Sequence, residues 1–147
     1  MNRDFVEMLS ALCAAGARFL IVGAHALAAH GAPRATGDLD IWIQPTPDNA
    51  ARVLTALRAF GAPLFDLGAN DLCAPDTVFQ IGIPPARIDI LTGISGVEFD
   101  GAWPRRIDVS IGDLTIGALG RADFVANKKA SGRPKDLLDL ELLPPER

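Results

Sequence analysis

One stretch constrains the fold of this chain more than any other: residues Phe19 to Ile43, which read FLIVGAHALAAHGAPRATGDLDIWI. It opens with a continuous apolar run over 19–22 that ends at a glycine, as expected of a strand buried on both faces. A short Ala-rich helix and an Arg-bearing loop follow, and then a second apolar strand that carries Asp38 and Asp40. Residues two apart on a strand point to the same face, so the two carboxylates are predicted to project side by side.

Paired carboxylates at the end of a buried strand favour a metal site. Two like charges brought together there are costly unless a cation lies between them, and hard oxygen ligands suit a divalent ion. A third acid, Asp89, lies in a later apolar strand, where Ile88 and Ile90 would face the core and Asp89 the opposite side. Two acids on one strand and a third on a neighbouring strand could hold the paired ions used in phosphoryl-type transfer.

The third acid has two rival interpretations. Asp89 could be an ordinary surface-facing strand residue, which is the better expectation for an arbitrary Asp. Asp108 also lies in a nearly identical local pattern, Arg-Ile-Asp-Val against Arg-Ile-Asp-Ile. Spacing alone does not choose between Asp89 and Asp108, and the more apolar surroundings of Asp89 favour it.

Length and composition narrow the class of protein. A chain of 147 residues with 49% hydrophobic residues predicts a single domain over residues 1–147. The apolar runs are shorter than a membrane span and the N-terminus lacks a signal-peptide pattern, so we expect a cytoplasmic protein without a membrane partner. The net charge of −4 argues against a broad electrostatic grip on nucleic acid. The negative net charge is compatible with binding of a nucleotide, because a bound metal ion can supply positive charge.

Helix and strand signals alternate along the chain and predict a mixed fold. Asn2 and Thr46 are predicted N-caps of helices that end at Gly16 and Gly61, and Gly112 is predicted to turn a hairpin. Residues 62–76 are expected to be irregular, and Trp103 lies in a predicted loop. The remaining predictions are strands over 77–83, 86–91, 105–111 and 114–116, and helices over 121–130 and 134–143.

The Gly23-Ala24 turn at a strand end could bind phosphate, because glycine permits close backbone approach and the first N–H groups of a helix attract anions. His25 and His30 lie on the same helix, where a histidine is more often a packing residue than a ligand. Arg34 could reach a triphosphate or be a solvated loop charge.

The segment 127–139 is the only basic cluster in this acidic chain. Lys128, Lys129 and Arg133 could form a cationic arm over phosphates, since Lys offers a point charge and Arg a planar fork. The alternative is a helix–helix turn with solvated charges.

Together these motifs resemble the nucleotidyltransferase fold of the DNA polymerase beta superfamily, whose pattern is a Gly turn, a D-x-[DE] strand and a later single acid. Residues 33–40 and 127–139 are similar to small bacterial stand-alone nucleotidyltransferases related to the AbiEii-type toxins and the minimal nucleotidyltransferases. The resemblance covers about Phe5 to Leu143. It implies an α+β (α/β) fold in which a mixed, twisted β-sheet is flanked by helices and followed by C-terminal helices.

The resemblance also implies roles for individual residues. Two Mg²⁺ ions, for which Mn²⁺ could substitute, would be held by Asp38, Asp40 and Asp89, and Asp89 would help to deprotonate the acceptor. Ala24 stands where the family has Gly or Ser, so a hydroxyl donor is missing unless His25 replaces it. The implied nucleotide-binding residues are Gly23, Ala24, His25, Arg34, Lys128, Lys129 and Arg133, and the downstream acids of undefined role are Asp136 and Asp139.

The implied reaction is transfer of a nucleoside monophosphate from an NTP to an acceptor hydroxyl, with release of pyrophosphate. The acceptor could be an RNA or tRNA end, a protein side chain or a small molecule. A second hypothesis is a catalytically quiet nucleotide-binding or partner-binding module, such as one component of a toxin–antitoxin system, and a protein partner or a homodimer is compatible with either. A hydrolase or metal protein unrelated to nucleotides would leave the basic cluster without a role.

Overall fold

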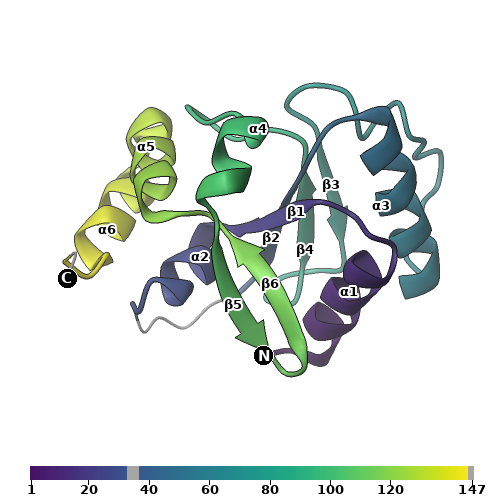
Figure 1. Cartoon of the computed structure of the whole chain (residues 1–147), viewed down its shortest axis with the longest axis horizontal. Coiled ribbons are helices and arrows are strands. Elements are labelled where there is room, and N and C mark those ends of the chain that lie inside the picture. Colours follow the sequence, from purple (N-terminus) through teal and green to yellow (C-terminus); the bar gives the residue numbers. More distant parts are fainter. Residues whose placement is uncertain (33–36, 146–147) are drawn as a thin grey trace.

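The structure is a computed structural model that describes residues 1–32 and 37–145. These ranges contain both helices and strands, which confirms the predicted mixed α/β character (Figure 1). The elements, in order, are α1 (Arg3–Ala14), β1 (Phe19–Val22), α2 (Gly23–Ala29), β2 (Leu39–Ile43), α3 (Pro47–Phe60), β3 (Val78–Ile81), β4 (Ile88–Leu91), α4 (Phe99–Ala102), the 3-10 helix η1 (Trp103–Arg105), β5 (Ile107–Ile111), β6 (Leu114–Ala118), α5 (Arg121–Ser131) and α6 (Pro134–Leu142).

The strands of the described ranges form one six-stranded mixed sheet in the order β3-β4-β2-β1-β6-β5. β2 runs parallel to β4 and antiparallel to β1, and β1 runs parallel to β6. The two outer pairs, β3 with β4 and β5 with β6, are antiparallel. The carboxyl end of β1 and the amino ends of β2 and β4 therefore meet at one end of the sheet.

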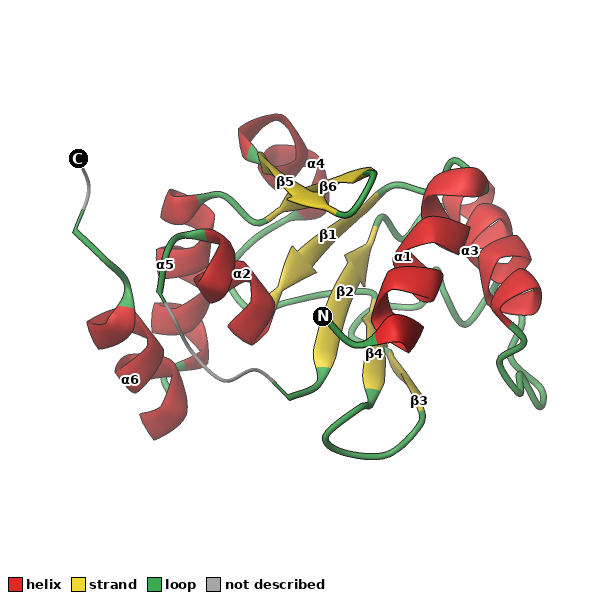
Figure 2. Cartoon of the chain, turned by 90° about the horizontal axis from the view of Figure 1, so that it is seen from below, coloured by secondary structure: helices red, strands yellow, loops and turns green. Residues whose placement is uncertain are grey.

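Helices cover both faces of the sheet, and the residues of β1 point alternately to one face and to the other. All four of its residues are buried, as predicted. Phe19 and Ile21 belong to a core shared with α1 and α3, whereas Leu20 and Val22 belong to a second core shared with α2, α4 and α5. Figure 2 shows α1 and α3 together on one side of the molecule and α5 and α6 on the other. We call the first the α1/α3 face and the second the α5 face.

Predicted caps begin and end the helices. The Asn2 side chain accepts from the Asp4 N–H at 2.7 Å, and Thr46 Oγ1 accepts from the Asn49 N–H at 3.4 Å. Gly61 ends α3 in the left-handed conformation, with φ of 88°. These caps confirm the predicted starts of both helices and the predicted end of α3, whereas α1 ends at Ala14, two residues before the predicted stop at Gly16.

The helical turns α4 and η1 were not predicted, because a single turn at 99–105 has no repeating apolar pattern from which a helix could be inferred. Aromatic packing holds the segment instead. Phe99 lies edge-on to Trp42 with ring centroids 5.0 Å apart, and it stacks on Trp103 at 5.7 Å.

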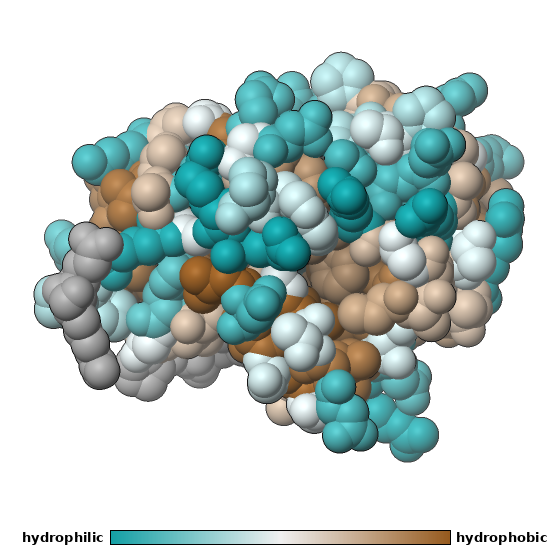
Figure 3. Space-filling view, in the orientation of Figure 1, coloured by the Kyte–Doolittle hydropathy of each residue, from teal (hydrophilic) through white to brown (hydrophobic). Residues whose placement is uncertain are grey.

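In the described part of the chain, no helix is long and apolar enough to cross a membrane. In Figure 3, brown apolar side chains gather over the β5–β6 hairpin. Ile107, Val109, Ile111 and Leu114 of this hairpin are only partly buried.

Candidate active site

The strand register brings two of the three predicted acids together. Asp40 on β2 and Asp89 on β4 are Cα partners in the parallel pair, and Asp40 is also the partner of Val22 on β1. Ile88 and Ile90 belong to the core on the α1/α3 face, so Asp89 between them points to the α5 face. Sequence pattern and register agree on this placement, because each strand carries one acid between two residues that face the core.

Gly23 makes room for the carboxylate of Asp40. It has a positive φ of 66°, and a Cβ added there would lie 2.5 Å from Asp40 Oδ2. Only glycine therefore fits at the end of β1, as expected where the backbone must pass close to an acidic site. The predicted juxtaposition of a Gly turn and the D-x-D strand is thus present in the fold.

Asp40 is held in an environment that disfavours its charge. Burial raises its pKa, and the charge of Asp89 and a hydrogen bond with it raise it further, to about 6. Lys135 opposes this shift. Asp38, just before β2, adds a small increment in the same upward direction, so the three acids interact electrostatically.

Arg87 was not identified from the sequence as a site residue, yet it joins two of the acids. Its Nε lies 2.8 Å from Asp89 Oδ1, and its Nη2 lies 3.3 Å from Asp38 Oδ2. The backbone N–H of Arg87 also donates to Asp38 Oδ1 at 3.1 Å. The available signal was the strand period, which places residues 87 and 89 on one face of the sheet.

Asp108, the rival of Asp89, lies on the outer strand β5, opposite Gly117 of β6. Two strands, β6 and β1, separate β5 from β2. Asp108 is exposed, so its location resolves the ambiguity in favour of Asp89 as the neighbour of Asp40.

A cleft of about 860 Å³ opens beside Asp40 on the α5 face. The β1–α2 turn, β2, the loop after β4 and the α5–α6 region all contribute to its walls. The predicted site residues that line it are Gly23, Asp40, Lys128 and Arg133, and the other lining residues include Asp76, Gly93, Ile94, Asn127 and Ser131. Residues from opposite ends of the sequence therefore share one cavity.

The basic cluster is anchored by the two downstream acids. Lys128 is 7% exposed, and its Nζ lies 3.3 Å from Asp136 Oδ1 and 3.1 Å from Asp139 Oδ2. Arg133 Nε donates to Asp136 Oδ2 at 2.8 Å. Burial raises the pKa of Asp136, but hydrogen bonds from Arg133 and Lys128 outweigh it and lower the pKa. Asp136 and Asp139 are thus counter-ions that hold α5 against α6.

Three residues implied as nucleotide ligands lie elsewhere. Ala24, His25 and Lys129 are not among the residues that line the cleft, and Arg34 lies outside the described residues. His25 instead lines a separate cavity of about 190 Å³ and packs edge-on against Phe5, with ring centroids 5.7 Å apart. Burial lowers its pKa, and a hydrogen bond with the Gly37 backbone opposes this. This placement matches the packing interpretation of His25.

The acids have the chemistry of a divalent-metal site but not its arrangement. Hard oxygen donors and the mutual repulsion of the carboxylates suit a small cation. However, no group of three or more His, Cys, Asp or Glu side chains within residues 1–32 and 37–145 is placed to hold a metal ion. Arg87 accounts for this in part, because its guanidinium lies where a cation between Asp38 and Asp89 would lie. A metal would therefore have to displace Arg87.

Comparison with known proteins supports the fold. A crystal structure from Thermotoga maritima, named a "putative nucleotidyltransferase", superposes with a TM-score of 0.62 at 16% sequence identity. The superposition covers 95% of this chain and 89% of that protein. No protein-family model matches the sequence, and no curated protein matches it.

At this identity the likeness is one of fold alone. It confirms the mixed sheet flanked by helices that the sequence motifs predict, whereas the AbiEii-type relationship stays a prediction. The chain has the α+β architecture of a nucleotidyltransferase-fold protein.

Proposed function

We propose that the chain is a metal-dependent nucleotidyltransferase that moves a nucleoside monophosphate from an NTP to an acceptor hydroxyl. One observation carries the proposal: the parallel register that sets Asp40 beside Asp89 at the glycine bend of β1. Asp40 lines the cleft at that point together with the basic residues Lys128 and Arg133. An acid and two cations in one cleft suit a substrate whose phosphates need both metal ligands and cationic contacts.

The proposed reaction uses the chain's residues in defined roles. Asp38, Asp40 and Asp89 would hold Mg²⁺, or Mn²⁺ in its place, once Arg87 has moved aside. Bound ions would supply the positive charge that offsets the phosphates. Asp89 would receive the proton of the acceptor hydroxyl. The acceptor oxygen then forms a bond to the α-phosphorus, and the bond between that phosphorus and the bridging oxygen breaks to release pyrophosphate.

The basic side chains would position the leaving group. Arg133 is exposed at the cleft and can turn its guanidinium toward a phosphate. Lys128 has less freedom, because two carboxylates already hold its ammonium. We therefore assign Arg133 the direct phosphate contact, and Lys128 the task of holding the α5–α6 turn in place.

The test is transfer of a label from α-labelled NTPs, with Mg²⁺ or Mn²⁺, to a panel of RNA, protein and small-molecule acceptors. Asp40→Asn and Asp89→Asn should abolish transfer, while Asp108→Asn on β5 serves as the matched control and should keep it. Transfer that persists in both site variants refutes the mechanism.

The observed Arg87 contacts favour one alternative, a catalytically quiet nucleotide-binding module. An arginine that already neutralises Asp38 and Asp89 leaves less need for a metal. Calorimetry with Mg-NTP separates the two functions, because tight binding without turnover supports the quiet module. A toxin–antitoxin role and a protein partner stay predictions, which purification with proteins encoded beside the gene can test.

A further inference from the structure

A second cavity of about 500 Å³ lies beside the proposed nucleotide cleft. Asp76, Gly93 and Ile94 line both cavities, so the two lie side by side and share a wall. Trp42 forms part of the second cavity and lies two residues beyond Asp40 on β2, which places both side chains on the α5 face. Two residues along a strand span about 7 Å, which is within the length of a small molecule.

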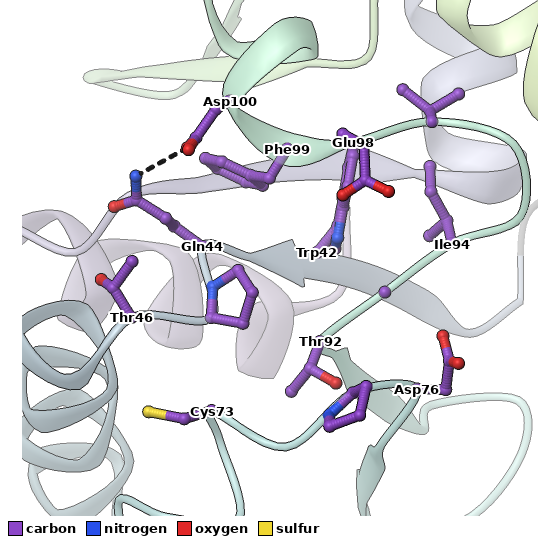
Figure 4. Close-up of a pocket in the computed structure, with 14 residues that line it drawn as sticks. Trp42, Gln44, Thr46, Cys73, Asp76, Thr92, Ile94, Glu98, Phe99 and Asp100 are labelled. Carbon is purple, nitrogen blue, oxygen red and sulfur yellow. Dashed lines mark hydrogen bonds between the residues drawn. The ribbon is translucent and has the colours of Figure 1, made fainter.

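The cavity carries strong negative charge. Asp76, Glu98 and Asp100 line it, and all three are exposed to solvent. Among the described residues they have no ion-pair partner, and Asp100 accepts only a neutral hydrogen bond, from Gln44 Nε2 at 3.1 Å. Figure 4 shows the three carboxylates around Trp42 on different sides of the cavity.

A buried donor faces the same cavity without a partner. Trp42 is 1% exposed, and its Nε1 has no hydrogen-bond acceptor in the described part of the chain. Buried N–H groups almost always find an acceptor, so an unpaired one in a cavity wall indicates a ligand atom. Figure 4 shows the indole nitrogen on the cavity side of the ring, below the Glu98 carboxylate in this view.

Shape and chemistry argue for a small organic cation over a metal ion. The volume falls in the range of about 300–1,000 Å³ that small-molecule pockets occupy. Within the described ranges, no three of the acids are close enough together to chelate one ion. The rings of Trp42 and Phe99 add an apolar wall that suits a carbon skeleton and can face an ammonium group.

We propose that this cavity is the acceptor site and that it takes a small amine-bearing alcohol. The inference rests on the proposed nucleotidyltransferase function. Ammonium groups of the acceptor would pair with Asp76, Glu98 and Asp100, and a ligand oxygen would accept from Trp42 Nε1. One hydroxyl would then point along β2 toward Asp40 and Asp89. This hydroxyl loses its proton to Asp89 and forms the new bond to the α-phosphorus as pyrophosphate leaves.

The test begins with binding in the absence of nucleotide. The probe is 1,3-diamino-2-propanol, and glycerol, which lacks the two amines, is its neutral counterpart. The chain has two tryptophans, so Trp103→Phe assigns the indole N–H resonance of Trp42 in ¹⁵N-labelled protein. The diamine should shift that resonance in wild type and in Trp103→Phe, and glycerol should not.

Variants of the acids locate the amine contacts. Glu98→Gln and Asp76→Asn should each weaken diamine binding by about fivefold to tenfold, because each removes one charge-assisted hydrogen bond. Asp108→Asn, an exposed acid on the far strand β5, should leave the affinity unchanged. Equal shifts with glycerol, no shift of the Trp42 resonance, or an equal loss in Asp108→Asn would each overturn the proposal.

Transfer assays test the amine-alcohol site separately from the proposed nucleotidyltransferase function. Formation of an NMP ester on the diamine hydroxyl, lost in Glu98→Gln, is the expected result. Transfer to RNA or protein acceptors without amine binding overturns the amine-alcohol site and leaves the nucleotidyltransferase function intact. Amine binding without transfer to any acceptor overturns the acceptor role and counts against the proposed function itself.

Discussion

The role of Lys128 can be decided by its effect on stability. Its ammonium lies 3.3 Å from Asp136 and 3.1 Å from Asp139, and the three side chains are almost fully buried. Removing one partner of a buried ion pair leaves the other charge uncompensated, which costs about 3–5 kcal/mol. Arg133 stays paired with Asp136 and its charge also acts on Asp139, so we expect Lys128→Met to lower the free energy of unfolding by about 3 kcal/mol.

For a domain of this size, 1 kcal/mol changes the melting temperature by about 3–4 °C, so the predicted shift is about 10 °C. Urea denaturation followed by circular dichroism measures the free energy, and a thermal melt measures the shift. The neighbouring Lys129 is exposed and supplies the matched control. Lys129→Met should change the stability by less than about 0.5 kcal/mol.

Equal stability of the two variants would refute the argument that Lys128 is a buried counter-ion. Calorimetry with Mg-NTP at low temperature, where Lys128→Met stays folded, then asks whether the residue also binds phosphate. If Lys128 acts only through the fold, the folded variant should keep most of the wild-type affinity, while Arg133→Gln should lose affinity.

Three further predictions follow from the charges at the site. The pKa of Asp40 is raised to about 6, so the ionised carboxylate is disfavoured in the folded chain. Asp40→Asn should therefore add about 1–3 kcal/mol to the free energy of unfolding, measured at pH 7.5 with a chelator present. A loss of stability in this variant would contradict the prediction. The pKa of Asp136 is lowered, so its contribution is complete above the unfolded pKa near 4 and is lost as the pH falls through the folded pKa. The stability gap between wild type and Asp136→Asn should therefore be widest near neutral pH and narrow below about pH 4, and a constant gap in urea titrations would argue against the ion pair. Arg87→Gln should bind Mn²⁺ severalfold more tightly in the absence of nucleotide, as measured by electron paramagnetic resonance, because the competing guanidinium is gone; unchanged affinity would mean that Arg87 does not compete.

The parts of the site that were predictable from sequence lie on regular strands. Asp40 and Asp89 interrupt apolar runs with period two, and that period fixes the face on which each side chain projects. The Gly bend could be located for a similar reason, since a buried strand that stops at Gly23 must turn there. Which strands become neighbours was not readable from the chain, and only the register shows that Asp89, and not Asp108, lies beside Asp40.

The parts that were missed depend on groups brought together from outside the strands. Asp76 comes from the irregular segment before β3, and Glu98 comes from the loop before α4, so no periodic pattern predicts that they share a cavity with Trp42. The Arg87 side chain is long and flexible and has three carboxylates nearby, so its ion-pair partners could not be predicted from the sequence. His25 was assigned by its position after the Gly turn, but its packing partner is Phe5 on α1, a contact between two helices that no local pattern predicts.

The register of β2 links stability to the proposed chemistry. Leu39, Ile41 and Ile43 fill the core on the α1/α3 face, and the residues between them, Asp40 and Trp42, line the two cavities on the α5 face. A slip of one residue would drive Asp40 into the apolar core and turn Ile41 toward the cleft. Burial of an unpaired carboxylate there would cost far more than the fold could offset, since domains of this kind are stable by only about 5–15 kcal/mol. The apolar residues on one side of β2 therefore fix the position of the acid and the indole on the other. The strand itself sets the distance between the proposed metal-binding residue and the proposed acceptor site.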